Sequence, residues 1–123
     1  MERDPLTEKV IGAAIDVHRF LGPGLLESVY EECLCHEING LGLAFKRQVP
    51  VPVSYKTTQI NCGFRADLLI EENLLLELKA VERVLPIHQA QILTYLKLSG
   101  LSTGLLINFN TTVLKDGINR FVI

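Results

Sequence analysis

Residues 64–80 read FRADLLI (64–70), EEN (71–73) and LLLELKA (74–80), two apolar segments around a short polar one. Both apolar segments have the length and composition of strands, and the polar triplet between them predicts a tight hairpin. With a three-residue loop at 71–73, Ile70 lies opposite Leu74. This hairpin is the best-defined part of the expected fold, because loop length fixes the register of both strands.

The second of these strands carries an acid and a base among leucines. Alternate residues of a strand share one face, so Glu77 and Lys79 project from the same side. Counting back from the loop puts Asp67 opposite Glu77, with β-carbons roughly 4.5–5.5 Å apart. Two carboxylates facing each other on a covered sheet repel, so the pair needs a cation between them. Lys79 is one candidate and a divalent metal is the other. An ordinary salt-bridged cluster on a solvated sheet face is the alternative.

A divalent metal at this position suits the available ligands. Mg²⁺ prefers oxygen ligands and keeps several waters, so Asp67, Glu77 and the main-chain carbonyl of Leu78 form a reasonable set. Such a metal polarises a phosphoryl oxygen and lowers the pKa of a bound water. Lys79 would then orient that water or neutralise charge that develops on a phosphate.

The flanking sequence predicts helices on both sides of the strands. Asp4 and Pro5 form a helix start, with a cap followed by proline, and an apolar stripe continues to Leu21. The remaining expected elements are a helix over 25–38 that Asn39-Gly40 ends, edge strands over 44–49 and 51–57 interrupted by Pro50 and Pro52, a helix from Pro86 to Leu98, and strands over 101–109 and 118–123. This order predicts one domain over residues 1–123, an α/β sandwich around a mixed sheet.

Composition is neutral on function. About half of the 123 residues are apolar, and no run of eighteen apolar residues predicts a membrane span. The net charge of −2 argues against a protein that holds nucleic acid by bulk charge alone. Three cysteines without framework spacing (Cys33, Cys35 and Cys62) predict reduced thiols and a cytoplasmic location, and Cys33, Cys35 and His36 lack the paired spacing of a zinc site.

Two motifs resemble a known family. Asp67 followed by Glu77-Leu78-Lys79 resembles the Asp…(Asp/Glu)-x-Lys signature of the PD-(D/E)XK nuclease superfamily, and GLLESVY (24–30) resembles the motif of the GxxExxY proteins within it. The resemblance implies a restriction-endonuclease-like α/β/α sandwich with a central mixed β-sheet. One departure is Ala66, which stands where many members have proline before the aspartate.

The resemblance also assigns further residues to the site. It implies that Glu27 supplies another carboxylate to the metal, and that Gln91 and Tyr95, spaced as Gln-x-x-x-Tyr, border the substrate cleft together with Tyr30. Gln91 and Tyr95 are four residues apart, so they share one face of a helix. The alternatives are a solvent-facing Glu27, a surface Gln91, a half-buried Tyr95 and a Tyr30 that only belongs to the core.

These observations predict a Mg²⁺- or Mn²⁺-dependent hydrolase of phosphodiester bonds in nucleic acid, with DNA favoured over RNA. The alternative is a non-catalytic nucleic-acid-binding or adaptor module that retains the nuclease fold. Because the chain is short and slightly acidic, a homodimer or a partner protein is a further expectation. An apolar C-terminal strand, residues 120–123, would offer an edge for such pairing.

Overall fold

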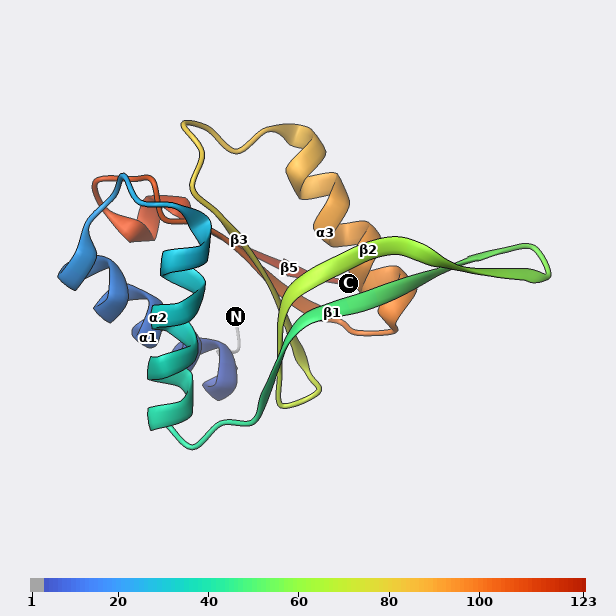
Figure 1. The fold of residues 1–123 in the computed structure, drawn as a ribbon, viewed down its shortest axis with the longest axis horizontal. Coiled ribbons are helices and arrows are strands. Elements are labelled where there is room, and N and C mark those ends of the chain that lie inside the picture. The colour runs from blue at the N-terminus through green and yellow to red at the C-terminus, as the bar shows by residue number, and fades with distance from the viewer. Residues whose placement is uncertain (1–3) are drawn as a thin grey trace.

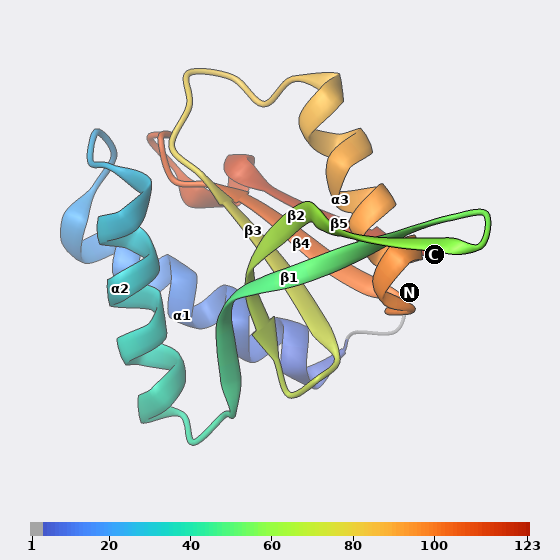
Figure 2. The same cartoon turned by 45° about the vertical axis from the view of Figure 1, so that its right-hand side comes forward.

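A computed structural model describes residues 4–123, apart from the side chain of Cys62. In chain order the elements are α1 (Pro5–Leu21), α2 (Glu27–Gly40), β1 (Phe45–Tyr55), β2 (Thr58–Ile70), β3 (Leu74–Lys79), α3 (Pro86–Ser99), β4 (Thr103–Asn108), a 3₁₀ turn η1 (Leu114–Gly117) and β5 (Ile118–Val122). Helices α1 and α2 lie on one side of the sheet and α3 on the other, as Figures 1 and 2 show. No helix in the described part of the chain is long and apolar enough to cross a membrane.

The sheet has five strands in the order β1-β2-β3-β4-β5. Only β3 and β4 run parallel, and α3 connects them, whereas the other neighbours are antiparallel. The predicted α/β/α sandwich with a central mixed sheet is therefore confirmed. The predicted hairpin register is also present, because Ile70 pairs with Leu74 across the turn at 71–73.

Helix ends follow local chemistry. The Asp4 carboxylate caps α1 by accepting hydrogen bonds from the Leu6 amide at 3.1 Å and the Thr7 hydroxyl at 2.9 Å. Helix α3 ends at Gly100, which adopts a left-handed φ of 74°. One expected stop was wrong: Asn39 and Gly40 belong to α2, and the left-handed residue is Gly42, at φ 74°.

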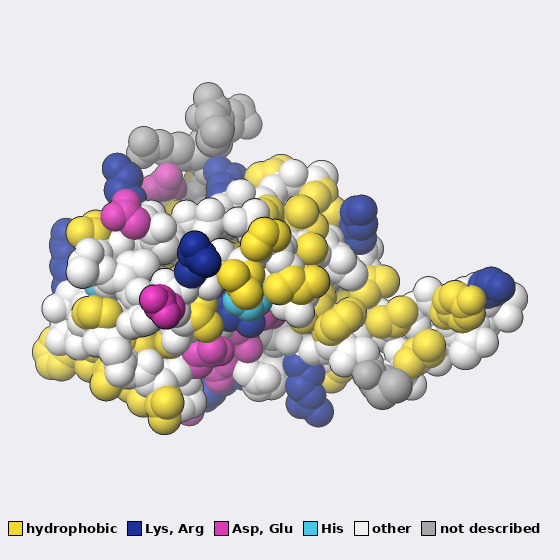
Figure 3. Space-filling model, turned by 90° about the horizontal axis from the view of Figure 1, so that it is seen from above, with side chains coloured by type: hydrophobic (Ala, Val, Ile, Leu, Met, Phe, Trp, Pro, Cys, Tyr) yellow, Lys and Arg dark blue, Asp and Glu magenta, His cyan; other side chains and the backbone are white. Residues whose placement is uncertain are grey.

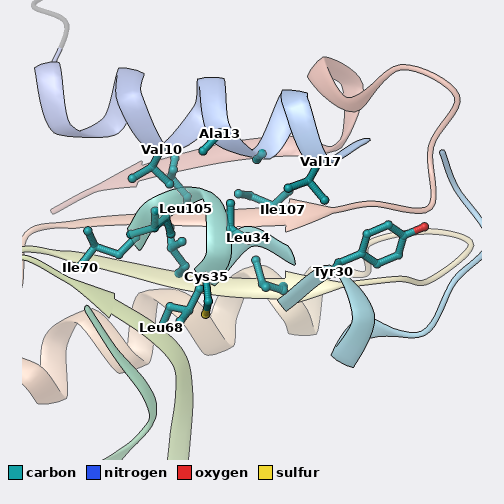
Figure 4. Packing of buried hydrophobic residues seen from close by; sticks show 14 of the residues in the cluster. Val10, Ala13, Val17, Tyr30, Leu34, Cys35, Leu68, Ile70, Leu105 and Ile107 are labelled. Atoms are coloured by element: carbon teal, nitrogen blue, oxygen red, sulfur yellow. The ribbon is translucent and has the colours of Figure 1, made fainter. Parts of the chain in front are cut away.

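The core has two parts, one on each face of the sheet. Leu68, Ile70, Leu76 and Leu105 pack under α1 and α2, as Figure 4 shows for part of this cluster. On the other face, α3 covers a smaller cluster. Its members are Val51, Ala66, Leu75, Ile92, Tyr95, Leu96 and Leu106. Since alternate residues of β3 serve opposite clusters, Glu77 and Lys79 belong to the α3 side.

The ribbon of β1 and β2 changes faces at one register position. In β2, Ala66 packs under α3 whereas Leu68 packs under α1 and α2, although alternate residues of a regular strand share a face. The regular ladder skips Gln48 and Asp67, which stand opposite each other between the pairs Arg47–Leu68 and Val49–Ala66. Gln48 has a left-handed φ of 51°. The break turns the Asp67 side chain toward β3.

Candidate active site

Asp67 and Glu77 meet where β2 leaves β3. The ladder between these strands ends at the pair Leu68–Leu76, and carboxylates replace main-chain groups beyond it. The Leu78 amide donates to Asp67 Oδ2 at 2.7 Å, and the Asp67 amide donates to Glu77 Oε1 at 3.2 Å. Each acid thus satisfies an amide of the other strand. Asp67 therefore lies beside Glu77, as the length of the 71–73 loop predicts. The two residues are not paired in the strand ladder, and each carboxylate instead contacts a main-chain amide of the opposite strand.

Burial and neighbouring negative charges disfavour the charged forms of both acids. The side of the sheet around Glu77 is covered, and only 7% of this residue is exposed. Burial, and next the negative charge of Asp67, raise the pKa of Glu77 to about 8. Burial also raises the pKa of Asp67, and the hydrogen bond from Leu78 partly opposes it. The site therefore attracts either a proton or a cation.

Lys79 supplies a positive charge next to this pair. It is half-buried at the end of β3, and its charge opposes the rise in the Glu77 pKa. The chain around it is fixed from β4: the Phe109 amide donates to the Lys79 carbonyl at 2.9 Å. Buried Asn108, which pairs with Lys79, accepts from the Val81 amide at 3.0 Å and donates to the Val81 carbonyl at 2.9 Å. The lysine thus sits between anchored main-chain segments.

Helix α2 adds acids on its exposed side. Glu31 accepts from Arg47 at 2.7 Å and from the Gln48 side chain at 2.9 Å, and Gln48 also approaches Asp67 Oδ1 at 3.4 Å. Glu27, one turn before Glu31, is the exposed first residue of α2. Its charge contributes to the raised pKa of both Asp67 and Glu77. Near the middle of the face in Figure 3, acidic side chains gather beside cationic and histidine side chains.

Tyr30 helps to position Glu27, because it is hydrogen-bonded to the loop that precedes Glu27. It is fully buried, its ring stacks on Phe109 with centroids 4.5 Å apart, and Figure 4 shows its hydroxyl pointing away from the core. That hydroxyl donates to the Gly22 carbonyl at 2.7 Å and accepts from the Leu25 amide at 3.1 Å. The bonds hold the loop that leads into Glu27. The expectation that Tyr30 lines a substrate cleft does not fit its burial, and the alternative, a core tyrosine, describes it better.

Tyr95 and Gln91 lie on α3, over the same face as Glu77. The Tyr95 ring is packed against Phe64, with centroids 4.8 Å apart. Burial, and then the charges of Glu77 and Asp67, raise the pKa of the Tyr95 hydroxyl, so it senses the acid pair. Gln91 is half-buried one turn earlier. His88, nearer the helix start, has a capping role: its Nδ1 accepts from the Leu85 amide at 3.0 Å.

The structure brings together fewer metal-ligating side chains than the three carboxylates (Glu27, Asp67 and Glu77) that the sequence predicts. Among the side chains that the structure describes, no group of three or more His, Cys, Asp and Glu lies close enough to hold a metal ion. Asp67 and Glu77 are together, whereas Glu27 acts on them through its charge. Cys33 and Cys35 are free cysteines, and the side chain of Cys62 lies outside the description.

Three residues of the site were missed from the sequence. Glu31 repeats Glu27 at a spacing of four on one helix face, and this is a signal that could have been found. Gln48 owes its place to a left-handed backbone, and Asn108 owes its place to a parallel pairing across α3. Neither has a local sequence signal.

A mixed sheet covered by helices on both faces, with two acids and a lysine where its central strands part, defines a restriction-endonuclease-like domain. A family model described as the PD-(D/E)XK nuclease superfamily matches residues 4–121, and the chain belongs to that superfamily. Its members are generally nucleases that hydrolyse phosphodiester bonds, typically with divalent metals such as Mg²⁺ or Mn²⁺. Searches of curated proteins and of solved structures found no match.

Proposed function

We propose that this chain is a metal-dependent nuclease that hydrolyses phosphodiester bonds, with DNA as the substrate in preference to RNA. One observation carries the proposal: half-buried Asp67 and buried Glu77 lie together, with Lys79 two residues beyond Glu77 on the same strand face. A buried acid pair that serves only stability is expensive, because each charge loses its hydration. Such pairs are concentrated at functional sites.

The residues present fit a divalent metal. Asp67 and Glu77 would hold it together with the Leu78 carbonyl, and Glu27 would complete the negative field. The Leu78 amide bonds to Asp67, and the carbonyl of the same residue in an extended strand points to the same edge, which supports this ligand. When bound, the metal would supply a Lewis acid for the phosphate and a water of lowered pKa.

The chain's own groups would have separate roles. Lys79 would orient the attacking water or stabilise the negative charge that grows on the phosphoryl oxygens. Tyr95 and Gln91 would border the bound strand from α3. Arg83 and His88 line a cavity of about 530 Å³ in the segment after Lys79, where a phosphate group has room. Tyr30 would be a positioning residue for Glu27.

Two finer assignments belong to the same proposal. The segment Gly24–Tyr30 supports membership of the GxxExxY group, because its glutamate begins α2 and its tyrosine fixes the preceding loop. The free thiols of Cys33 and Cys35 support a cytoplasmic location.

The test is cleavage of labelled single- and double-stranded DNA and RNA with Mg²⁺, with Mn²⁺ and with a chelator. Wild type should cleave only with metal. Lys79→Ala should lower the rate by about 10² or more, the usual contribution of one well-placed charged group. Lys115→Ala, at an exposed lysine of η1, is the matched control and should match wild type. A wild-type rate equal to that of Lys79→Ala would refute the proposal.

A non-catalytic adaptor is the second candidate, and the lack of a three-ligand group among the described side chains favours it. Calorimetric titration with Mn²⁺ distinguishes the two. A nuclease should bind Mn²⁺ at micromolar to millimolar concentrations, and Asp67→Asn should abolish the heat. An adaptor should show no metal heat and still bind nucleic acid.

A further inference from the structure

The outer part of the β1–β2 hairpin, residues 52–64, projects from the body, as Figures 1 and 2 show; we refer to it as the arm. Every residue from Ser54 to Asn61 is exposed. At about 3.3 Å per residue, the arm reaches roughly 15–20 Å from the sheet. A two-stranded hairpin without a packed face is only marginally stable in water. We therefore expect a binding partner to cover the arm.

The charge of the arm differs from that of the rest of the chain. Between Arg47 and Asp67 there is no acidic residue, although the chain contains 14 acids among 123 residues and has a net charge of −2. Lys56 at the tip and Arg65 at the base are both exposed. In Figure 3 the arm carries hydrophobic and uncharged side chains with a cationic one at its end. Because the arm and its base carry cations and no acidic residue, the arm suits an anionic partner.

The tip holds its cation at a conformational cost. Tyr55 pairs with Thr58, so Lys56 and Thr57 form a two-residue turn, and Lys56 has φ 54°. Glycine or asparagine is favoured at such a position, because a β-carbon is strained there. The Lys56 Nζ lies 5.3 Å from the centroid of the Tyr55 ring. The tip therefore carries an exposed positive charge at a position where glycine would be less strained.

The base of the arm contains an irregularity that directs it. Val51 pairs with Phe64 but Val53 pairs with Ile60, so β2 has more residues than β1 in this interval. A β-carbon on Gly63 would lie 2.9 Å from the Val51 carbonyl oxygen, so the strands approach closely there. Bulges increase twist and turn a strand aside. Three residues beyond Phe64 the same strand reaches Asp67, so the arm and the acid pair belong to one ribbon.

We infer that the arm enters the major groove of B-form DNA and holds the duplex against the acid pair, an inference that rests on the proposed function. The major groove, about 12 Å wide, admits a two-stranded ribbon. The corresponding groove of A-form RNA is deep and too narrow, and a single strand has no groove. The arm therefore selects double-stranded DNA, with Lys56 and Arg65 on phosphates. The rival occupant, a second copy packed on Ile60 and Phe64, is an outcome of the test.

The test measures binding separately from cleavage. The full chain is titrated, in the presence of a chelator, onto labelled 20-base-pair duplexes of DNA and of RNA and onto the single DNA strand, with anisotropy as the signal. Lys56→Gly is the variant, since glycine relieves the left-handed strain and keeps the hairpin folded. We expect duplex DNA binding about fivefold or more weaker and a salt dependence lower by about one charge, with RNA and single-strand binding unchanged. Lys9→Ala, an exposed lysine of α1, should match wild type.

Three results would overturn the inference: equal duplex DNA affinity for Lys56→Gly and wild type, equal losses on all three ligands, or light scattering that shows a wild-type dimer and a monomeric Lys56→Gly. Cleavage with Mn²⁺ is measured in parallel. If Lys56→Gly loses duplex DNA binding and wild type does not cleave, the role of the arm is supported and the proposed nuclease activity is refuted. If both proteins cleave and bind duplex DNA with equal affinity, the nuclease activity is supported and the role of the arm is refuted.

Discussion

The free energy of unfolding should fall as the pH rises from 5 to 9, and Glu77 should be the main reason. Its pKa is raised from an ordinary 4.5 to about 8, so the folded chain holds a proton that the unfolded chain has released. A raised pKa contributes stability that is complete below 4.5 and is lost as the pH passes 8. The slope from one group is at most about 1.4 kcal/mol per pH unit, and the whole interval is worth no more than about 5 kcal/mol.

Glu77→Gln isolates this effect. Glutamine keeps an oxygen that can accept from the Asp67 amide, but it carries no titratable group. The difference between variant and wild type should be small at pH 5 and should grow to about 2 kcal/mol or more in favour of the variant at pH 9. Glu72→Gln, at an exposed turn residue paired with Lys46, is the control and should change little across the range.

Urea unfolding at five pH values, without divalent metal, measures the difference. A difference that stays flat, or that favours wild type at high pH, would refute the claim that burial and Asp67 hold a proton on Glu77. Adding Mn²⁺ at 100 times its dissociation constant should return about 2.7 kcal/mol to wild type at pH 8 and nothing comparable to Glu77→Gln.

Three further perturbations test the supports of the site. Asn108→Ala removes both bonds to the segment after Lys79, so urea unfolding should show a loss of about 1–3 kcal/mol, with cleavage reduced in parallel. Tyr30→Phe keeps the stack on Phe109 but removes the hydroxyl that holds the loop before Glu27; Mn²⁺ titration should show several-fold weaker binding and denaturation a loss of about 1–2 kcal/mol. Gly117→Ala places a β-carbon against the Asn108 carbonyl and should lower the melting temperature, whereas Gly12→Ala, where nothing lies within 4 Å, should raise it.

Much of the fold could be predicted because its signals are local. Proline at the first helical position marked the starts of α1 and α3, and the length of the turn at 71–73 fixed the β2–β3 register. Pro50 and Pro52 were expected to interrupt two strands, but β1 runs through both. It is an edge strand, so a missing amide need not break a ladder. β2 begins at Thr58 and not at 64. The alternation of Ile60, Cys62 and Phe64 with Asn61 and Gly63 is a strand signal that was overlooked.

The site could be predicted only in part, for a physical reason. Asp67, Glu77 and Lys79 stand out because a charged residue in a leucine-rich strand is costly to bury unless an opposite charge or a bound ion compensates it. Gln48 could not be found, since its position depends on a backbone angle that its side chain does not favour. Asn108 could not be found either, because its partner Val81 is 27 residues away and meets it only through the parallel pairing of β3 and β4.

The two acids also explain why β2 can leave the sheet at this point. When a strand departs, the main-chain amides along the gap lose their partners, and a buried amide without one costs about 1–3 kcal/mol. Here the Leu78 amide finds the Asp67 carboxylate and the Asp67 amide finds Glu77, so the side chains replace the missing ladder. The same break, opposite left-handed Gln48, reverses the faces of the ribbon that continues into the arm. Replacing Asp67 by alanine should therefore disturb both the acid pair and the direction of the arm, whereas asparagine, which can still accept from Leu78, should remove the charge and leave the ribbon in place.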